Sequence, residues 1–378
     1  MRRWRRSWLL ALAAVLGAGG LLLWSQGVTA QVRASLLACL QGLVPSLFPF
    51  LVLASFLARS PAGDALGRLL TPLLRWGFRL PACCGGTVLL GLLGGYPAGA
   101  RGISLLLAQG RLTQSQAARA LGFCVNPGAA FLVTYVGGSL LGDASLGWAL
   151  FFSVTGSSLL LGVLSGLGQP LPPRESPPPP PAQGAAPLFQ AVRDASAALV
   201  SLGGWVLLFG AASPLLQGAG LWDLGAGLLG AGGLLTPRDA QSVLGFLWEV
   251  TAGAGTAAQA GASGPVFAFG LAFGGLCVHL QILSLFSPFP GRLGRFFLFR
   301  LLHGLGAAGL FLVLRPLFWG EGATAVWTSL GGGVPQAEAF SATWLGGLSL
   351  VLLCGAFLLL TGRERETEDC AAGGDVLQ

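Results

Sequence analysis

The run GLLGGYPAGARGISLLL, residues 91–107, is apolar enough to enter a membrane, yet it contains a proline, a tyrosine, five glycines and an arginine. Inside hydrocarbon every peptide group must be hydrogen-bonded within the protein. A helix can therefore break at membrane depth only where it is buried in protein or lines a polar cavity. The break between Gly94 and Gly102 predicts a cavity that other segments of the chain enclose.

The composition supports an all-α polytopic membrane protein embedded in a lipid bilayer. Hydrophobic residues make up 53% of the 378 positions and charged residues only 9%, and several apolar runs are long enough to cross a bilayer. The net charge of +7 comes from arginines in short loops beside these runs. That distribution is typical of residues that set membrane topology, so we expect no nucleic-acid partner.

Hydropathy predicts about eight transmembrane helices and two interrupted segments. The crossings span residues 8–24, 34–58, 120–140, 144–167, 196–217, 264–286, 297–314 and 341–361. The interrupted segments, 82–108 and 240–260, are interpreted as re-entrant hairpins that return to the side from which they entered.

The arginines test this topology. With the amino terminus inside, seventeen fall on the inner side: Arg2, Arg3, Arg5, Arg6, Arg59, Arg68, Arg75, Arg79, Arg111, Arg119, Arg174, Arg193, Arg292, Arg295, Arg300, Arg363 and Arg365. Only Arg33, Arg238 and Arg315 fall outside, and Arg101 lies within the first hairpin. This bias predicts that both termini face the cytoplasm.

The chain divides into two membrane repeats and their flanking segments. We expect an N-terminal anchor helix over 1–30, a first repeat over 31–169, a proline-rich cytoplasmic linker over 170–187, a second repeat over 188–318, a loop and helix over 319–362 and a charged tail over 363–378. Val28–Thr29–Ala30 resembles a signal-peptidase site, so removal of the first helix is the alternative to an uncleaved anchor.

The two hairpins contain a short similar motif. Residues 95–101 correspond to residues 249–255, 154 positions later, with a common Ala-Gly-Ala. Their topology would invert one half relative to the other, which is how secondary transporters are commonly built, with the substrate site where the breaks meet. The alternative is a chance match, because 61 residues of the chain are glycine.

Ionisable groups at membrane depth are costly and therefore candidates for function. Arg101 ends the first break, and the free N–H groups of the half-helix that begins at Gly102 would also favour an anion. Glu249 opens the second break, either as a proton or cation carrier or as the counter-ion of Arg101. Arg101 could instead extend to the inner surface as a topology charge.

Further polar residues complete the candidate substrate site. His279 and Gln281 lie in the sixth crossing, where the histidine serves either proton coupling or an interhelical hydrogen bond, and Asn126 precedes a proline that breaks the third crossing. The predicted site comprises Tyr96, Pro97, Gly99, Arg101, Gly102, Asn126, Glu249, Thr251, Gly253, His279 and Gln281.

The sequence contains no recognisable catalytic motif, and its seven cysteines show no metal-binding spacing. We therefore expect neither an enzyme nor a cofactor or metal site, with an intramembrane enzyme as the minor alternative. The sequence leaves the oligomeric state open.

Six motifs together resemble the YlbJ-type family of sporulation integral membrane proteins, also called stage V sporulation protein VV, in the nucleoside-recognition (Gate) domain superfamily. They are VPSLFPFLVLASFL (44–57), GGYPAGARGISLLLAQGRLT (94–113), FCVNPGAAFLVTYVG (123–137), FLWEVTAGAG (246–255), FGGLCVHLQILSLFS (273–287) and RLLHGL (300–305). They occur in collinear order over residues 34–315.

The resemblance implies export of dipicolinic acid from the mother cell across the outer forespore membrane. Dipicolinate is a flat aromatic dianion, which suits an arginine, half-helix N–H groups and the ring of Tyr96. The alternatives are a nucleoside or other small-anion permease of the same fold and a non-transporting sporulation scaffold. The long proline linker departs from the family pattern.

Overall fold

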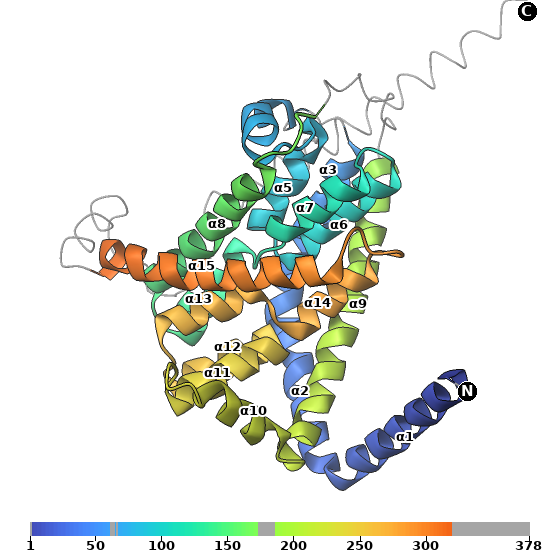
Figure 1. Ribbon diagram of the computed structural model, residues 1–378, viewed down its shortest axis with the longest axis vertical. Helices are drawn as coiled ribbons and strands as arrows, with labels where there is room; N and C mark the ends of the chain where they lie inside the picture. The colour runs from blue at the N-terminus through green and yellow to red at the C-terminus, as the bar shows by residue number, and fades with distance from the viewer. Residues whose placement is uncertain (1, 61–64, 66, 173–185, 320–378) are drawn as a thin grey trace, which may run out of the picture.

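The computed structural model describes residues 2–60, 65, 67–172 and 186–319, and every regular element in these ranges is a helix (Figure 1). The expected crossing at 341–361 and the charged tail lie outside the described residues, as does most of the proline-rich linker.

The first half begins with two consecutive helices and ends with a long apolar one. Its elements are α1 (Arg2–Leu23), α2 (Ser25–Ala38), the π-helix η1 (Cys39–Leu43), α3 (Val44–Arg59), the π-helix η2 (Leu73–Phe78), the 3-10 turn η3 (Ala82–Cys84), α5 (Gly85–Leu93), α6 (Tyr96–Ala108), α7 (Gln114–Phe123), the π-helix η4 (Phe131–Leu140) and α8 (Ala144–Gly166). The expected domain boundary at residue 30 falls inside α2.

The second half follows the linker with the same order of long helix, hairpin, broken segment and long helix. Its elements are α9 (Ala186–Gly218), α10 (Leu221–Gly230), α11 (Pro237–Trp248), α12 (Val250–Ala260), α13 (Gly264–Phe273), α14 (Gly275–Ser284) and α15 (Leu293–Trp319). Helix α10 occupies a stretch that hydropathy assigns to a loop.

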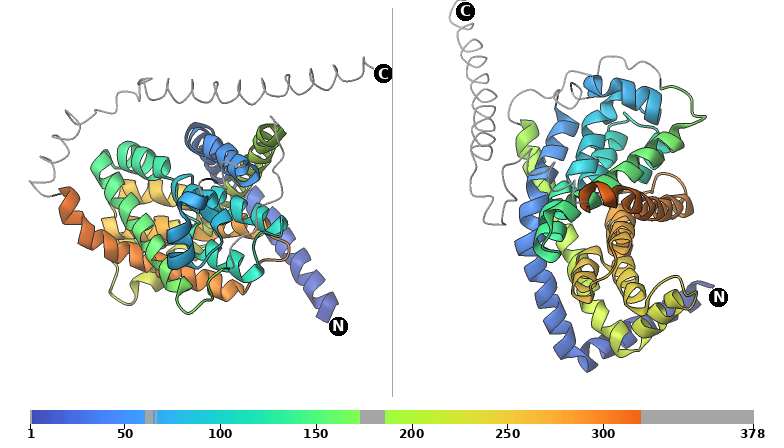
Figure 2. Two further views of the ribbon diagram at one scale, coloured as in Figure 1. Left: turned by 90° about the horizontal axis from the view of Figure 1, so that it is seen from above. Right: turned by 90° about the vertical axis from the view of Figure 1, so that its left-hand side faces the viewer.

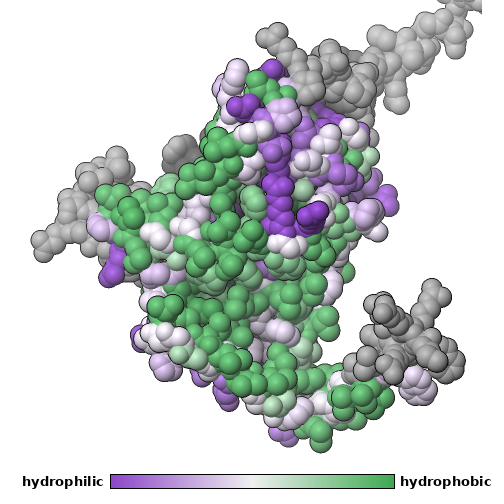
Figure 3. Space-filling model, viewed as in Figure 1, coloured by the Kyte–Doolittle hydropathy of each residue, from purple (hydrophilic) through white to green (hydrophobic). Residues whose placement is uncertain are grey.

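Four described segments are long and apolar enough to cross a membrane: Ala144–Gly166, Pro187–Gly218, Gly264–Ser284 and Leu293–Leu317. Shorter apolar helices surround them, and large apolar side chains cover much of the visible surface (Figure 3). This architecture is consistent with the polytopic membrane protein that the sequence predicts.

Corresponding helices of the two halves pack against each other. The continuous column formed by α2, η1 and α3 lies beside α9, and α8 lies against α15 (Figures 1 and 2). Helix α1 leans away from this body, and its main contacts are with α2 and α9 (Figure 1). The hairpins and broken segments are held between these pairs.

The first interrupted segment forms a helical hairpin, but its break is shorter than the expected one between Gly94 and Gly102. Helix α6 already begins at Tyr96, so Arg101 and Gly102 lie inside this helix and no half-helix with free N–H groups begins at Gly102. Helix α5 has nine residues, or about 14 Å, too short to cross a bilayer alone. The chain reverses at Gly95, whose φ of 106° few residues other than glycine adopt. A Cβ on Gly99 would lie 2.8 Å from the Cα of Gly91, so the two glycines let the helices touch at their backbones.

The second hairpin uses the same device. A Cβ on Gly253 would lie 2.6 Å from the backbone carbon of Gly245, and these glycines stand 154 positions after Gly99 and Gly91. In both hairpins, therefore, the two α-helices beside the break approach closely because each contributes one glycine to the contact. The two glycines of a pair are eight residues apart in the sequence.

Two further segments are broken, one of them unexpectedly. The third crossing is interrupted between α7 and η4 around Asn126, as predicted. The sixth, expected to be one crossing over 264–286, is divided at Gly274 and Gly275, which adopt φ values of 89° and 72°. The Gly-Gly pair therefore interrupts the helix that the sequence predicts to be continuous over this crossing.

Candidate functional site

The helix breaks meet in the middle of the protein. A Cβ on Gly128, in the broken third segment, would lie 3.1 Å from the backbone nitrogen of Gly95 in the first hairpin. A Cβ on Gly275 would lie 3.5 Å from the carbonyl oxygens of Leu247 and Trp248 beside the second break. Each hairpin break therefore faces the broken segment of its own half.

One buried cation joins the two halves. Arg300 of α15 is fully buried, and its Nη1 donates to the carbonyl of Val125 at 2.7 Å while its Nε donates to that of Phe273 at 3.1 Å. Its Nη2 donates to the carbonyl of Ala272. These oxygens are freed by the breaks after α7 and α13, so the guanidinium satisfies carbonyls of both halves at once.

This position corrects the topology count. The arginine count assigns Arg300 to the cytoplasmic side as a topology charge, whereas the structure buries this residue inside α15. The hydroxyl of Tyr96 also spans the halves, since it donates to the carbonyl of Leu271. Like Arg300, it ties the end of α13 to the opposite half.

A narrow cavity extends through this junction in two adjoining chambers. The Glu249 chamber is lined by Leu43, Leu47, Gly95, Tyr96, Pro97, Pro127, Gly128, Phe131, Leu202, Val206, Glu249, Val250, Thr251, Val278 and Gln281. The Arg101 chamber is lined by Tyr96, Pro97, Arg101, Ala198, Ser201, Leu202, Gln281, Ile282, Ser284 and Leu285. Each offers a water-sized molecule only ≈ 30 Å³.

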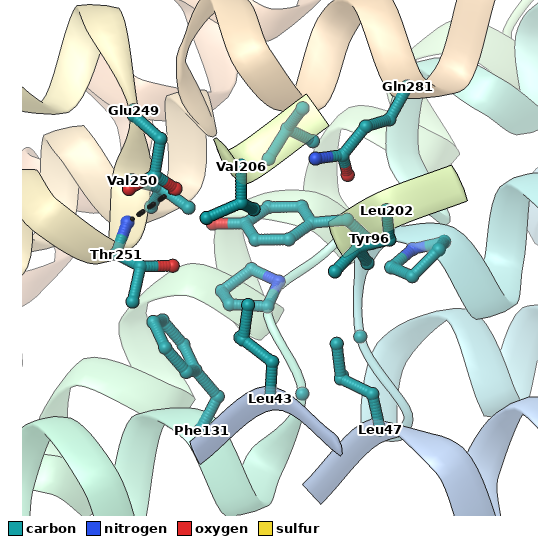
Figure 4. A pocket seen from close by; sticks show the side chains of 15 residues that line it. Leu43, Leu47, Tyr96, Phe131, Leu202, Val206, Glu249, Val250, Thr251 and Gln281 are labelled. Carbon is teal, nitrogen blue, oxygen red and sulfur yellow. Dashed lines mark hydrogen bonds between the residues drawn. The ribbon is translucent and has the colours of Figure 1, made fainter. Parts of the chain in front are cut away.

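Four residues line both chambers: Tyr96, Pro97, Leu202 and Gln281. Figure 4 shows the Tyr96 ring between the side of Glu249 and Thr251 and the side of Gln281. These four side chains therefore form the wall between the chambers, and their movement would connect them.

Glu249 caps a helix in the first of these chambers. Its carboxylate oxygens accept hydrogen bonds from the backbone N–H groups of Thr251 at 2.9 Å and Ala252 at 2.7 Å. The carboxylate thus compensates the positive end of α12 and fixes the second break. It forms no ion pair with Arg101 within the described chain, so the counter-ion role considered from sequence is not what the structure shows.

Arg101 shares a different counter-ion. Asp194 of α9 lies 2.6 Å from Nη2 of Arg59 and 3.3 Å from Nη2 of Arg101. The three side chains are 12 to 28% exposed, and the Nε atoms of both arginines are buried without a hydrogen-bond partner among the described residues. Two guanidinium groups thus face one carboxylate, which leaves an excess positive charge at the Arg101 chamber.

The structure brings six of the predicted site residues to the cavity: Tyr96, Pro97, Arg101, Glu249, Thr251 and Gln281. The other five are not among the residues that line these two chambers: Gly99, Gly102, Asn126, Gly253 and His279. Gly102 leaves room for Thr87. Asn126 donates to the carbonyl of Phe123 at 2.8 Å and to Ser158 at 3.0 Å.

His279 occupies an aromatic cluster. Its Nε2 lies 2.9 Å from the carbonyl oxygen of Phe273, and its ring packs edge-on against Phe273, Phe296 and Phe297. This bond joins two residues of the same expected crossing, across its break at Gly274 and Gly275. His303 is likewise bonded to a backbone carbonyl, that of Val154.

Sequence reasoning missed Arg59, Asp194 and Arg300 as parts of the site. Arg300 carries a readable signal, because an arginine four residues inside an apolar run is costly unless it is bonded. Asp194 also stands close to an apolar run, in RDASAALV. Its pairing with two arginines from distant helices follows from tertiary packing, which a single sequence does not reveal.

Comparisons with known proteins agree with the motif resemblance. The chain is similar to the sporulation integral membrane protein YlbJ of Bacillus subtilis (strain 168), with 26% identity over 348 residues that cover 84% of each protein. This confirms the YlbJ-like character that the six motifs predict. No family model matches the chain, and no solved structure matches it.

Proposed function

We propose that this chain, similar along most of its length to a sporulation integral membrane protein, is a transporter that moves dipicolinate out of the mother cell across the outer forespore membrane. The observation that carries the proposal is the arrangement of Arg59 and Arg101 around Asp194 at the edge of a closed central cavity. The motif resemblance suggests dipicolinate as the substrate, and the two positive charges of Arg59 and Arg101 suit this dianion.

The two arginines match a dicarboxylate. A guanidinium binds a carboxylate through two parallel hydrogen bonds, and each of these arginines has a buried Nε without a partner in the part of the chain that the structure describes. In the proposed cycle the carboxylates of the substrate replace Asp194 as the counter-ion of Arg59 and Arg101. Both guanidinium groups therefore keep a negatively charged partner throughout the cycle. Tyr96, in the wall beyond Arg101, offers a ring face to the aromatic substrate.

Transport requires the cavity to open. A space of ≈ 30 Å³ in each chamber holds about one water and excludes an aromatic dicarboxylate. We take the described structure as an occluded, empty conformer in which Tyr96, Leu202 and Gln281 close the path. Movement of α9, which carries Leu202 as well as Asp194, would widen both chambers together.

We further propose that the halves are inverted repeats that alternate access to this cavity. The shared order of elements, the glycine pairs at an offset of 154 residues and the packing of corresponding long helices support this. Broken helices at equivalent positions around a central site are how many secondary transporters bind their substrates. Cytoplasmic termini and a transport role without catalysis belong to the same proposal.

Substrate binding by the purified protein tests the site. In titration calorimetry, dipicolinate should bind the wild type, and Arg101→Gln should weaken binding about ten- to 150-fold, the loss of one charge-assisted contact. Arg238→Gln removes an exposed arginine in the first turn of α11 and should leave affinity unchanged. Equal affinity of wild type and Arg101→Gln would exclude Arg101 as a ligand.

The nucleoside alternative rests on the uncharged polar side chains of Thr251 and Gln281 in the Glu249 chamber. It predicts that uridine competes with dipicolinate or binds in its place. A scaffold predicts binding of neither, together with normal spore assembly when Arg101 is replaced by alanine.

A further inference from the structure

A second basic site lies away from the two chambers, in a groove between α7 and α15. It offers ≈ 670 Å³ and is lined by Gln114, Ser115, Ala118, Arg119, Gly122, Phe289, Pro290, Gly291, Arg292, Gly294, Arg295, Phe296, Leu298 and Phe299. Among the described residues, three arginines and no acidic residue line it, so this lining carries a concentrated positive charge.

Arg119 forms the fixed part of this charge. Only 5% of the residue is exposed, and its Nη1 and Nη2 donate to the carbonyls of Phe78 and Arg79, each at 2.9 Å. Its Nε is buried and has no partner in the described chain. A buried cation that is hydrogen-bonded only to neutral carbonyls leaves its charge uncompensated.

Arg292, directly before α15, and Arg295, in its first turn, are both exposed and supply the rest of this charge. The guanidinium of Arg295 lies 5.7 Å above the ring of Phe299, which orients it along the groove. Both ion pairs found among the described residues belong to Asp194, so these two arginines have no acidic partner there.

An apolar stripe continues from the groove along the same face of α15. Leu298, Leu302 and Leu305 follow Arg295 at helical spacing and are 52%, 43% and 55% exposed. In Figure 3 hydrophilic residues gather in the upper part of the visible face and hydrophobic residues cover the area beside and below them. A positive groove joined to an exposed apolar stripe matches an amphiphile rather than a simple ion.

We propose that this groove binds an anionic glycerophospholipid, with the phosphodiester among Arg119, Arg292 and Arg295 and an acyl chain along the leucines of α15. Basic pockets between membrane helices bind anionic head groups in this way. Aromatic side chains at the groove, such as Phe289 and Phe296, suit the boundary between head group and hydrocarbon. The site is separate from the cavity, and its occupation does not depend on which substrate is transported.

Spin-labelled lipids test the proposal on the full-length protein in phosphatidylcholine vesicles. Labelled phosphatidylglycerol should be motionally restricted at this site in preference to labelled phosphatidylcholine. Replacing Arg292→Gln and Arg295→Gln together should reduce the preference about 25-fold, or about fivefold for each arginine. Both side chains are exposed, so the fold should persist, and thermal unfolding of the same samples checks it.

The matched control replaces Arg33→Gln and Arg238→Gln, which removes the same charge from exposed positions elsewhere and should preserve the preference. No preference in the wild type would overturn the proposal, as would an equal loss in the control pair. Glycerol phosphate tests the source of the phosphate. If it displaces the labelled lipid at low millimolar concentration, the groove is a phosphate site rather than a lipid site.

Discussion

Removing the cation that joins the two halves should loosen the protein at its centre. Arg300→Met keeps an unbranched side chain of similar reach but loses all three hydrogen bonds to Val125, Ala272 and Phe273. Each bond to a charged donor contributes about 1.5–3 kcal/mol. The gross loss is therefore about 5–9 kcal/mol.

Part of this loss is recovered, because the variant no longer buries a guanidinium, whose desolvation costs several kcal/mol. The net destabilisation should therefore be smaller than the gross loss, about 3–5 kcal/mol. Arg300→Lys keeps the charge but not the planar fork, so its stability should lie between wild type and Arg300→Met.

The chain contains its own reporters for this experiment. Cys124 and Cys277 are free, have no exposed surface and flank the breaks that Arg300 joins. Thermal unfolding in detergent, followed by a thiol-reactive fluorophore, should therefore show Arg300→Met unfolding about 5 °C or more below wild type. Arg238→Gln is the control for loss of one positive charge. If Arg300→Met labels at the wild-type temperature, Arg300 does not hold the breaks together.

Three further changes test separate contacts. Gly253→Ala should lower the free energy of unfolding by about 1–3 kcal/mol, because its Cβ would lie 2.6 Å from the backbone of the facing helix. Gly255→Ala, on the same helix with no described atom within 4 Å of the new Cβ, should be neutral or stabilising. Equal thermal stability of the two variants would contradict the close approach. Glu249→Ala should cost about 0.5–2 kcal/mol as a lost helix cap, measured by the same unfolding assay, and wild-type stability would show that the cap is dispensable. Asp194→Asn should tighten dipicolinate binding about tenfold in calorimetry, since it removes the carboxylate that competes for Arg59 and Arg101; weaker binding would mean that Asp194 supports the substrate instead of competing with it.

Much of the helical framework could be predicted because it follows from local chemistry. Apolar runs predict α8, α9 and α15 as long helices, and Asn126–Pro127 predicts a break that the structure contains. The first break is predicted too long, from Gly94 to Gly102, because α6 already begins at Tyr96. The break at Gly274–Gly275 could not be predicted, because a Gly-Gly pair in an apolar run is compatible both with close helix packing and with an interrupted helix. Only the surrounding contacts, which require positive φ at both glycines, select the interruption.

The partners of the charged residues could not be predicted from the chain. An arginine beside an apolar run usually marks topology, so Arg300 was grouped with the loop arginines although it is fully buried. Arg101 and Glu249 were natural candidates to pair, but Asp194 reaches Arg101 from a helix 93 positions away along the chain, and backbone N–H groups occupy Glu249. Such choices depend on how helices pack, which hydropathy and spacing do not encode.

Dipicolinate flux through the reconstituted protein tests the central proposal most directly. Proteoliposomes that contain the wild type should release preloaded dipicolinate faster than protein-free vesicles, and Arg101→Gln should slow release about tenfold or more while Arg238→Gln should not. Release at the protein-free rate from wild-type vesicles that still bind dipicolinate would contradict a transport role. Equal release by wild type and Arg101→Gln would place the path of the substrate elsewhere in the protein.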